Sequence, residues 1–167
     1  YTTQYKLDSR NVFTILNPVP TMKFGNLMQS YKQADSFRDK EIVYVGRFIK
    51  MKNVESAVRA FAKLKDTSYR MVLIGNGPTE KELHELVDNL GLRERVEFLP
   101  SLTHTELFRR ITNCAYVILP SWTDVSPNQI HECLALGIPF LLTQENYLSI
   151  KKQIPLMIDP RSVEDIA

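Results

Sequence analysis

The sequence predicts an α/β domain with a Rossmann-like parallel sheet flanked by helices. Short runs rich in β-branched and aliphatic residues recur along the chain, with helical patterns between them, and this alternation is typical of βαβ units. The runs are continuously apolar, as expected of strands covered on both faces. The expected strands are Ile42 to Val45, Met71 to Ile74, Val96 to Leu99, Tyr116 to Leu119 and Phe140 to Thr143.

The first two helices of this pattern each carry a single apolar stripe, which predicts one buried face apiece. The stripe positions are Val54, Ala57, Val58, Phe61 and Leu64 in the first helix, then Leu83, Leu86, Val87 and Leu90 in the second.

Start and stop signals support these helices. Thr79 with Glu82 and Thr103 with Glu106 each form a capping-box pattern, and Gly91 stands where a helix-terminating glycine is expected. A later helix is expected to open with Ser126 as N-cap and Pro127 as its first residue, and to run through Leu136 to Gly137.

The segment before Asp39 has a different character. Residues 13–16 are expected to form a strand, and a proline-rich and then polar stretch follows them. We therefore divide the chain into a leading strand with its connecting segment, residues 1–38, and an α/β domain, residues 39–167.

Composition favours an ordinary globular protein. The 167 residues are 24% charged and 44% hydrophobic, with a net charge of +2, and the basic residues are scattered among acidic ones. A nucleic-acid binder would usually show a basic stripe, so that class is not favoured. Cys114 and Cys133 lack paired spacing, which predicts buried, reduced thiols rather than a disulfide or a metal site. The first residues resemble no secretion signal, so a cytoplasmic location is expected.

Ligands of open parallel sheets bind beyond the carboxyl ends of the strands. Gly46 and Arg47 follow the first strand of the domain, and Lys52 precedes the next helix. Two cations beside a helix N-terminus favour a phosphate or diphosphate. The alternative is a pair of solvated loop cations.

The turn Gly75–Pro78 follows the second strand of the domain. It lacks the third glycine of the dinucleotide fingerprint and the lysine of the P-loop, so it predicts a tight structural turn.

Two acids, Asp124 and Glu132, are eight residues apart, one before a helix and one inside it. Together they could bond different hydroxyl groups of a ligand across the helix end, although a loop aspartate and an exposed helix glutamate are the simpler interpretation. His131 and Glu132 begin a zinc-like motif, but Ala135 stands where its second histidine belongs, so no metal is predicted. His84 and His104 are expected to face solvent.

Three stretches together resemble the C-terminal donor-binding domain of retaining glycosyltransferases of the GT-B fold, specifically family 4, also called group 1. They are VYVGRFIKMKN (43 to 53), VLIGNGP (72 to 78) and AYVILPSWTDVSPNQIHECLALGIPFLL (115 to 142), and ILNPVPTMKF (15 to 24) is similar to the segment by which that family enters its second domain.

This resemblance implies a nucleotide-diphosphate sugar as donor substrate, with no cofactor and no required metal. Arg47 and Lys52 match the pair that binds the diphosphate, and Ser126 opens the helix whose N-terminus faces it. Glu132 matches the acid that holds the ribose, and the backbone at Leu102 matches the stretch beside the nucleobase. Asp124 falls where the first acid contacts the donor sugar, which makes it the candidate catalytic residue.

The implied reaction passes the sugar to an acceptor glycan or lipid with retention of anomeric configuration, as in polysaccharide, lipopolysaccharide or glycolipid biosynthesis. The N-terminal acceptor domain of the family is not in this sequence, so the chain alone is expected to be inactive, and the resemblance allows a peripheral membrane association of the full-length form. Asp124 replaces the usual glutamate and Val125-Ser126 replaces a common Gly-Phe pair. These departures motivate an alternative, a non-catalytic binding or assembly subunit; an unrelated flavodoxin-like or nucleotide-binding domain is a third option.

Overall fold

A computed structural model describes residues 39–124, 128–144 and 157–167, and within them a six-stranded parallel sheet in the order β3-β2-β1-β4-β5-β6. This confirms the predicted fold class. The strands are β1 (Asp39–Val45), β2 (Arg70–Ile74), β3 (Val96–Leu99), β4 (Cys114–Leu119), β5 (Phe140–Thr143) and β6 (Met157–Ile158).

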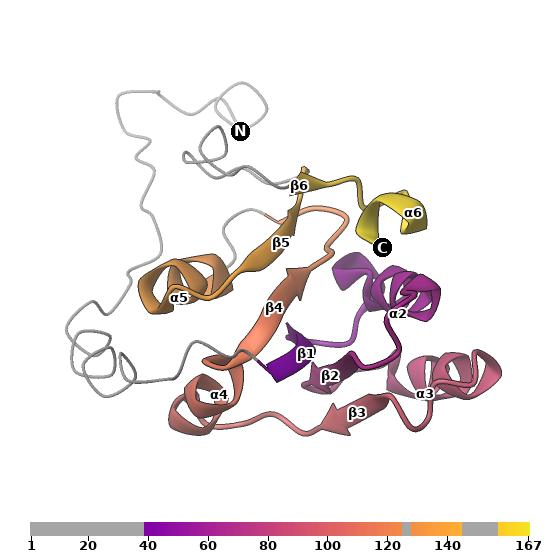
Figure 1. Cartoon of the computed structure of the whole chain (residues 1–167), viewed down its shortest axis with the longest axis horizontal. Helices are drawn as coiled ribbons and strands as arrows, with labels where there is room; N and C mark the ends of the chain where they lie inside the picture. Colours follow the sequence, from indigo (N-terminus) through magenta and orange to yellow (C-terminus); the bar gives the residue numbers. More distant parts are fainter. Residues whose placement is uncertain (1–38, 125–127, 145–156) are drawn as a thin grey trace, which may run out of the picture.

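Helices cover both faces of the sheet (Figure 1). One face carries α2 (Val54–Lys63), α3 (Glu80–Asn89) and α6 (Val163–Ile166), and the other carries α4 (His104–Ile111) and α5 (Asn128–Leu136). Each face has its own apolar cluster, so burial on two sides explains the continuously apolar strands. Strand β6 and helix α6 were not predicted from the sequence, because two and four residues are too short to show a period.

The strand order reverses direction at β1. The chain moves from β1 outward through β2 to β3, and then returns to place β4 on the other side of β1. At such a switch point the loops after β1 and β4 lead to helices on opposite faces of the sheet, and ligands of open parallel sheets bind beside these loops. The fold therefore directs the search for a site to the loops that follow β1 and β4.

The helix starts agree with the sequence in one case and differ in another. Thr103 accepts a hydrogen bond from the Glu106 amide while the Glu106 carboxylate bonds back, which confirms that capping box. The capping box predicted at Thr79 is wrong: its side chain accepts no capping hydrogen bond, and its amide donates to the Phe48 carbonyl at 3.1 Å. Leu90, predicted to lie on the buried stripe of α3, is 36% exposed at the end of that helix.

The predicted turn at Gly75–Pro78 packs directly on the loop after β1. A Cβ on Gly75 would lie 2.0 Å from the Gly46 carbonyl oxygen, and one on Gly77 would lie 2.3 Å from that of Phe48. The Phe48 amide also donates to the Asn76 carbonyl at 2.8 Å. The two glycines thus let two loops touch backbone to backbone, and the turn has the structural role that the sequence predicted.

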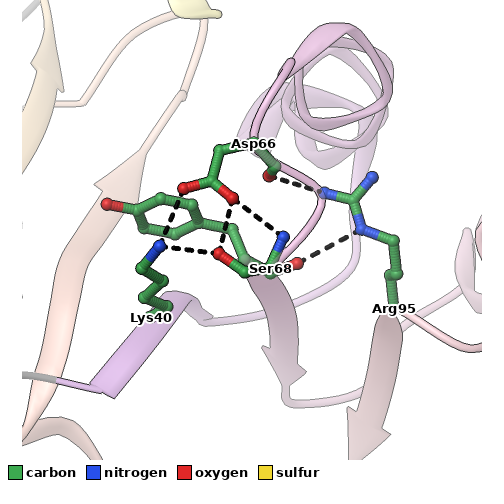
Figure 2. A network of polar contacts seen from close by, with 5 residues as sticks. Lys40, Asp66, Ser68 and Arg95 are labelled. Carbon is green, nitrogen blue, oxygen red and sulfur yellow. Dashed lines mark hydrogen bonds and ion pairs between the residues drawn. The ribbon is translucent and has the colours of Figure 1, made fainter.

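The opposite, amino edge of the sheet is closed by a polar network around the connection from α2 to β2. Figure 2 shows the Lys40 ammonium between the Asp66 carboxylate, at 2.9 Å, and the Ser68 hydroxyl, at 2.7 Å. Arg95 donates to the Tyr69 carbonyl at 3.2 Å and to that of Asp66 at 3.4 Å. Lys40 and Asp66 pair with each other, and the Arg95 guanidinium donates to backbone carbonyls, so the network fixes the connection from α2 to β2.

Cys114 and Cys133 are free and buried in the cluster beneath α4 and α5, as predicted. Burial raises the pKa of the Cys133 thiol to about 12, and the neighbouring Cys114 and Glu132 add to the effect. Both thiols therefore serve as small core residues.

Candidate functional site

The loop from Gly46 to Asn53, here called the basic loop, joins β1 to α2. It ends in a short 3-10 helix, η2 (Lys50–Lys52), and then at Asn53, which has a left-handed backbone with φ 53°. The buried Asn53 side chain donates to the Pro120 carbonyl at 3.1 Å and to that of Pro160 at 2.8 Å. One amide thus ties the end of the basic loop to the end of β4 and to the segment after β6.

Lys52 and Asp124 meet across the switch point. The Lys52 ammonium lies 2.5 Å from the Asp124 carboxylate, and the two side chains are 30% and 16% exposed. The Ser121 hydroxyl lies 3.4 Å from the same carboxylate oxygen, and the Trp122 amide donates to the Met51 carbonyl at 2.9 Å. Side chain and backbone contacts therefore join the basic loop to the loop after β4.

Arg47 lies at the other end of the basic loop, exposed to solvent. It lines a pocket of about 180 Å³ with Gly46, Gly75, Asn76, Ser101 and Leu102, at the carboxyl ends of β1, β2 and β3. The structure thus brings Arg47 and Leu102 together, as the predicted site requires. It also adds the side chains of Asn76 and Ser101, which lie 3.4 Å apart at the rim.

Glu132 lies within α5 and is partly buried. Burial raises the pKa of its carboxyl group, and the nearby His104 imidazole acts in the opposite direction. His104 is the first residue of α4, and its ring lies edge-on to Phe108, with the centroids 5.6 Å apart. His104 is exposed, as predicted, but its electrostatic influence places it in the neighbourhood of Glu132.

Ser126 and the expected N-cap fall outside the described residues, as do the strand expected at residues 13–16 and the whole segment 1–38. The convergence of Arg47 and Lys52 on the start of α5 therefore stays a prediction. What the structure places at the carboxyl edge is Arg47 with Leu102, and Lys52 with Asp124.

The sequence analysis assigned no role to the side chains of Asn53, Asn76 or Ser101. Asn53 had one available signal: it follows Lys52 and precedes α2 in the N-cap position, where asparagine is favoured. The contacts of Asn53 with Pro120 and Pro160 depend on the strand order, and no local sequence pattern predicts them.

Chemically, the arrangement suits an anionic ligand that also carries hydroxyl groups. Arg47 and Lys52 supply cations, and the glycine-rich loops with their backbone amides lie beside Arg47. Asp124 and Glu132 supply carboxylates that can accept hydrogen bonds from hydroxyl groups. Within the described residues, no group of three or more histidine, cysteine, aspartate or glutamate side chains could hold a metal ion.

A comparison with known families matches residues 29–154 to the model described as glycosyl transferases group 1. This chain belongs to that family. The match covers the basic loop, the Gly75–Pro78 turn and both acids, Asp124 and Glu132.

Among curated relatives, a lipopolysaccharide core biosynthesis glycosyltransferase of Rhizobium meliloti is 36% identical over 86 residues, which cover 52% of this chain and 23% of that protein. Among solved structures, WaaG, a glycosyltransferase involved in lipopolysaccharide biosynthesis, aligns with a TM-score of 0.77 at 19% identity, over 99% of this chain and 48% of its own. Anabaena HepE in complex with UDP-glucose aligns with a TM-score of 0.69 at 20% identity, over 90% of this chain and 42% of its own.

The structural likenesses identify the sheet as the Rossmann-like half of a GT-B fold. The curated relatives are longer proteins, and this chain spans 15% to 34% of their lengths. No helix among the described residues is both long and apolar enough to cross a membrane.

Proposed function

We propose that this chain binds a nucleotide-diphosphate sugar and that the longer protein transfers the sugar to an acceptor glycan or lipid, with retention of anomeric configuration. The observation that carries the proposal is the meeting of Lys52 and Asp124 at the switch point of the sheet, on the same edge as the pocket of Arg47 and Leu102. Family membership supports the reaction class.

In this proposal the diphosphate bonds Arg47 and Lys52, and the N-terminus of α5 faces it. These charges stabilise the leaving diphosphate as the glycosidic bond breaks, so the mechanism requires no metal ion. The ribose hydroxyls bond Glu132, and the backbone at Leu102 lies along the nucleobase. Asp124 bonds a hydroxyl of the donor sugar.

The UDP-glucose bound by HepE, a protein of similar fold, supports a sugar nucleotide as the ligand class. The acceptor site belongs to the N-terminal domain of GT-B proteins, so turnover needs the longer protein. We infer that the present chain binds donor and transfers nothing.

A thermal-shift panel of UDP-glucose, GDP-mannose and ADP-glucose tests the binding step. A ligand at about a hundred times its Kd stabilises the fold by about 2.7 kcal/mol, which raises Tm by roughly 5 to 11 °C for a chain of this size. Arg47→Ala should lose most of this shift. Arg70→Ala is the matched control, because Arg70 is exposed at the first position of β2, on the opposite edge of the sheet. If no sugar nucleotide raises Tm, or if both variants lose the shift equally, the proposal is wrong.

The competing function is a non-catalytic subunit of the same fold. This alternative rests on two differences from the family pattern, Asp124 in place of the usual glutamate and Val125-Ser126 in place of a common Gly-Phe pair. Turnover of a sugar nucleotide by the full-length protein separates the two functions. Transfer to an acceptor supports the enzyme, whereas tight nucleotide binding without transfer to any acceptor supports the subunit.

A further inference from the structure

A buried tyrosine lies directly beneath the basic loop. Tyr44, in β1, is 1% exposed, and its hydroxyl donates to the Arg47 carbonyl at 3.0 Å. The same carbonyl accepts the Ile49 amide at 3.0 Å. Two donors from different directions therefore fix the peptide group that follows the Arg47 side chain.

Apolar packing does not explain the hydroxyl group. The Tyr44 ring lies against Phe48, with centroids 6.1 Å apart, and phenylalanine would fill the same space. Burying a hydroxyl group is unfavourable unless it is hydrogen-bonded, and the Tyr44 hydroxyl bonds the Arg47 carbonyl of the loop. A Cβ at Gly46 would lie 2.8 Å from the Tyr44 hydroxyl oxygen, so the loop rests on the phenol itself.

The phenol also remains a donor at any physiological pH. Burial raises the Tyr44 pKa well above its ordinary value, and the negative charge of Asp124 adds to the effect. The Tyr44 hydroxyl therefore stays protonated beneath the loop, within the electrostatic influence of the proposed sugar-binding acid.

The Arg47 side chain, by contrast, is exposed, and no ion pair or side-chain hydrogen bond to it occurs among the described residues. The backbone of Arg47 sets the direction of its Cα–Cβ bond, and therefore the point from which the guanidinium reaches toward a ligand. At the other end of the loop Asn53 holds the backbone, but Asn53 bonds carbonyls of other segments and does not contact Arg47.

We propose that Tyr44 is a positioning residue for the diphosphate: its hydroxyl orients the Arg47 peptide and thereby the guanidinium that bonds the ligand. This inference rests on the proposed function, because it assumes that Arg47 meets a diphosphate. Tyr44 itself touches no ligand.

The test compares the Kd of UDP, GDP and ADP with the Kd of the matching nucleoside, by calorimetry, on the 167-residue chain. The measured quantity is the ratio of the nucleoside Kd to the diphosphate Kd. Tyr44→Phe should lower this ratio threefold to tenfold and leave the nucleoside Kd unchanged. Tyr116→Phe removes a hydroxyl from an exposed position on the neighbouring strand β4 and should change neither value.

The decisive arm repeats Tyr44→Phe in an Arg47→Ala background. If Tyr44 acts through Arg47, the substitution has no further effect on the ratio there, because the side chain that it orients is gone. A merely structural tyrosine would lower Tm and weaken nucleoside and diphosphate together, or would have the same effect in both backgrounds, and either result overturns the proposal. Failure of the unsubstituted chain to bind any of the three diphosphates would defeat the proposed function, and with it this inference.

Discussion

Substituting Asp124 by asparagine should tighten diphosphate binding while it slows sugar transfer. Asp124 holds the Lys52 ammonium at 2.5 Å. A phosphate oxygen that bonds the same ammonium at about 2.8 Å lies within about 5 Å of that carboxylate oxygen. Two negative unit charges at about 5 Å repel by about 0.8 kcal/mol in water and by about 3 kcal/mol at an effective dielectric constant of about 20.

Asparagine keeps the shape of Asp124 and removes its charge. Because the repulsion is lost and Lys52 is released, we expect the free energy of diphosphate binding to become more favourable by about 1 to 2 kcal/mol. The Kd of the nucleoside diphosphate should therefore fall about fivefold to thirtyfold. The Kd of the uncharged nucleoside should not change. In the full-length protein, the lost contact to the donor sugar should lower kcat by about one to two orders of magnitude, or about 1.4 to 2.7 kcal/mol.

The assay is calorimetric titration of the chain with diphosphate and nucleoside, together with thermal unfolding. Loss of the partly buried ion pair should lower stability by about 1 to 2 kcal/mol, and Tm by roughly 2 to 8 °C. Asp66→Asn is the control, since its pair with Lys40 is 50% and 54% exposed on the opposite edge of the sheet, and it should lower Tm less and leave binding unchanged. Weaker diphosphate binding by Asp124→Asn would refute the idea that Asp124 competes for Lys52.

Three further predictions follow from burial and backbone geometry. Burial raises the pKa of Glu132 above its ordinary 4.5, so the stability of the folded state falls as pH rises above that value. Glu132→Gln should therefore raise Tm at about pH 7 and make Tm depend less on pH. The same substitution should weaken nucleotide binding. Cys133, with its pKa raised to about 12, should react with a thiol reagent at pH 8 no faster than the protein unfolds. Gly75→Ala should cost more than about 2 kcal/mol by denaturant titration, because its Cβ meets the Gly46 carbonyl, whereas Gly91→Ala, with φ 67° and open space, should cost about 1 kcal/mol.

The sheet could be predicted because each long strand is buried on two faces and therefore reads as an unbroken apolar run. The same logic indicates the edge at which a ligand is expected, since all parallel strands present their carboxyl ends there. The two-residue strand β6 offers no such run, and its pairing with β5 depends on a neighbour that the sequence does not specify.

The candidate site residues were chosen from local signals, and these signals did not predict how the residues pair. Arg47, Lys52 and Asp124 each stand after a strand, which is a local signal. That Lys52 pairs with Asp124, 72 residues away, depends on β4 returning beside β1, and no periodicity encodes this return. Thr79 shows the opposite failure: its local sequence has the pattern of a capping box, but in the fold its side chain caps nothing and its amide donates to Phe48 in an adjacent loop.

The central claim is that one nucleotide sugar binds at the carboxyl edge of this sheet. Amide chemical-shift mapping of the isotope-labelled chain, titrated with the sugar nucleotide that gives the largest thermal shift, tests it most directly. We predict that the largest changes fall at Gly46 to Asn53, at Gly75 and Asn76, at Ser101 and Leu102, and at Ser121 to Asp124, with little change at Lys40, Asp66 or Arg95. Changes that concentrate at the amino edge, or no change at saturating ligand, would contradict the account.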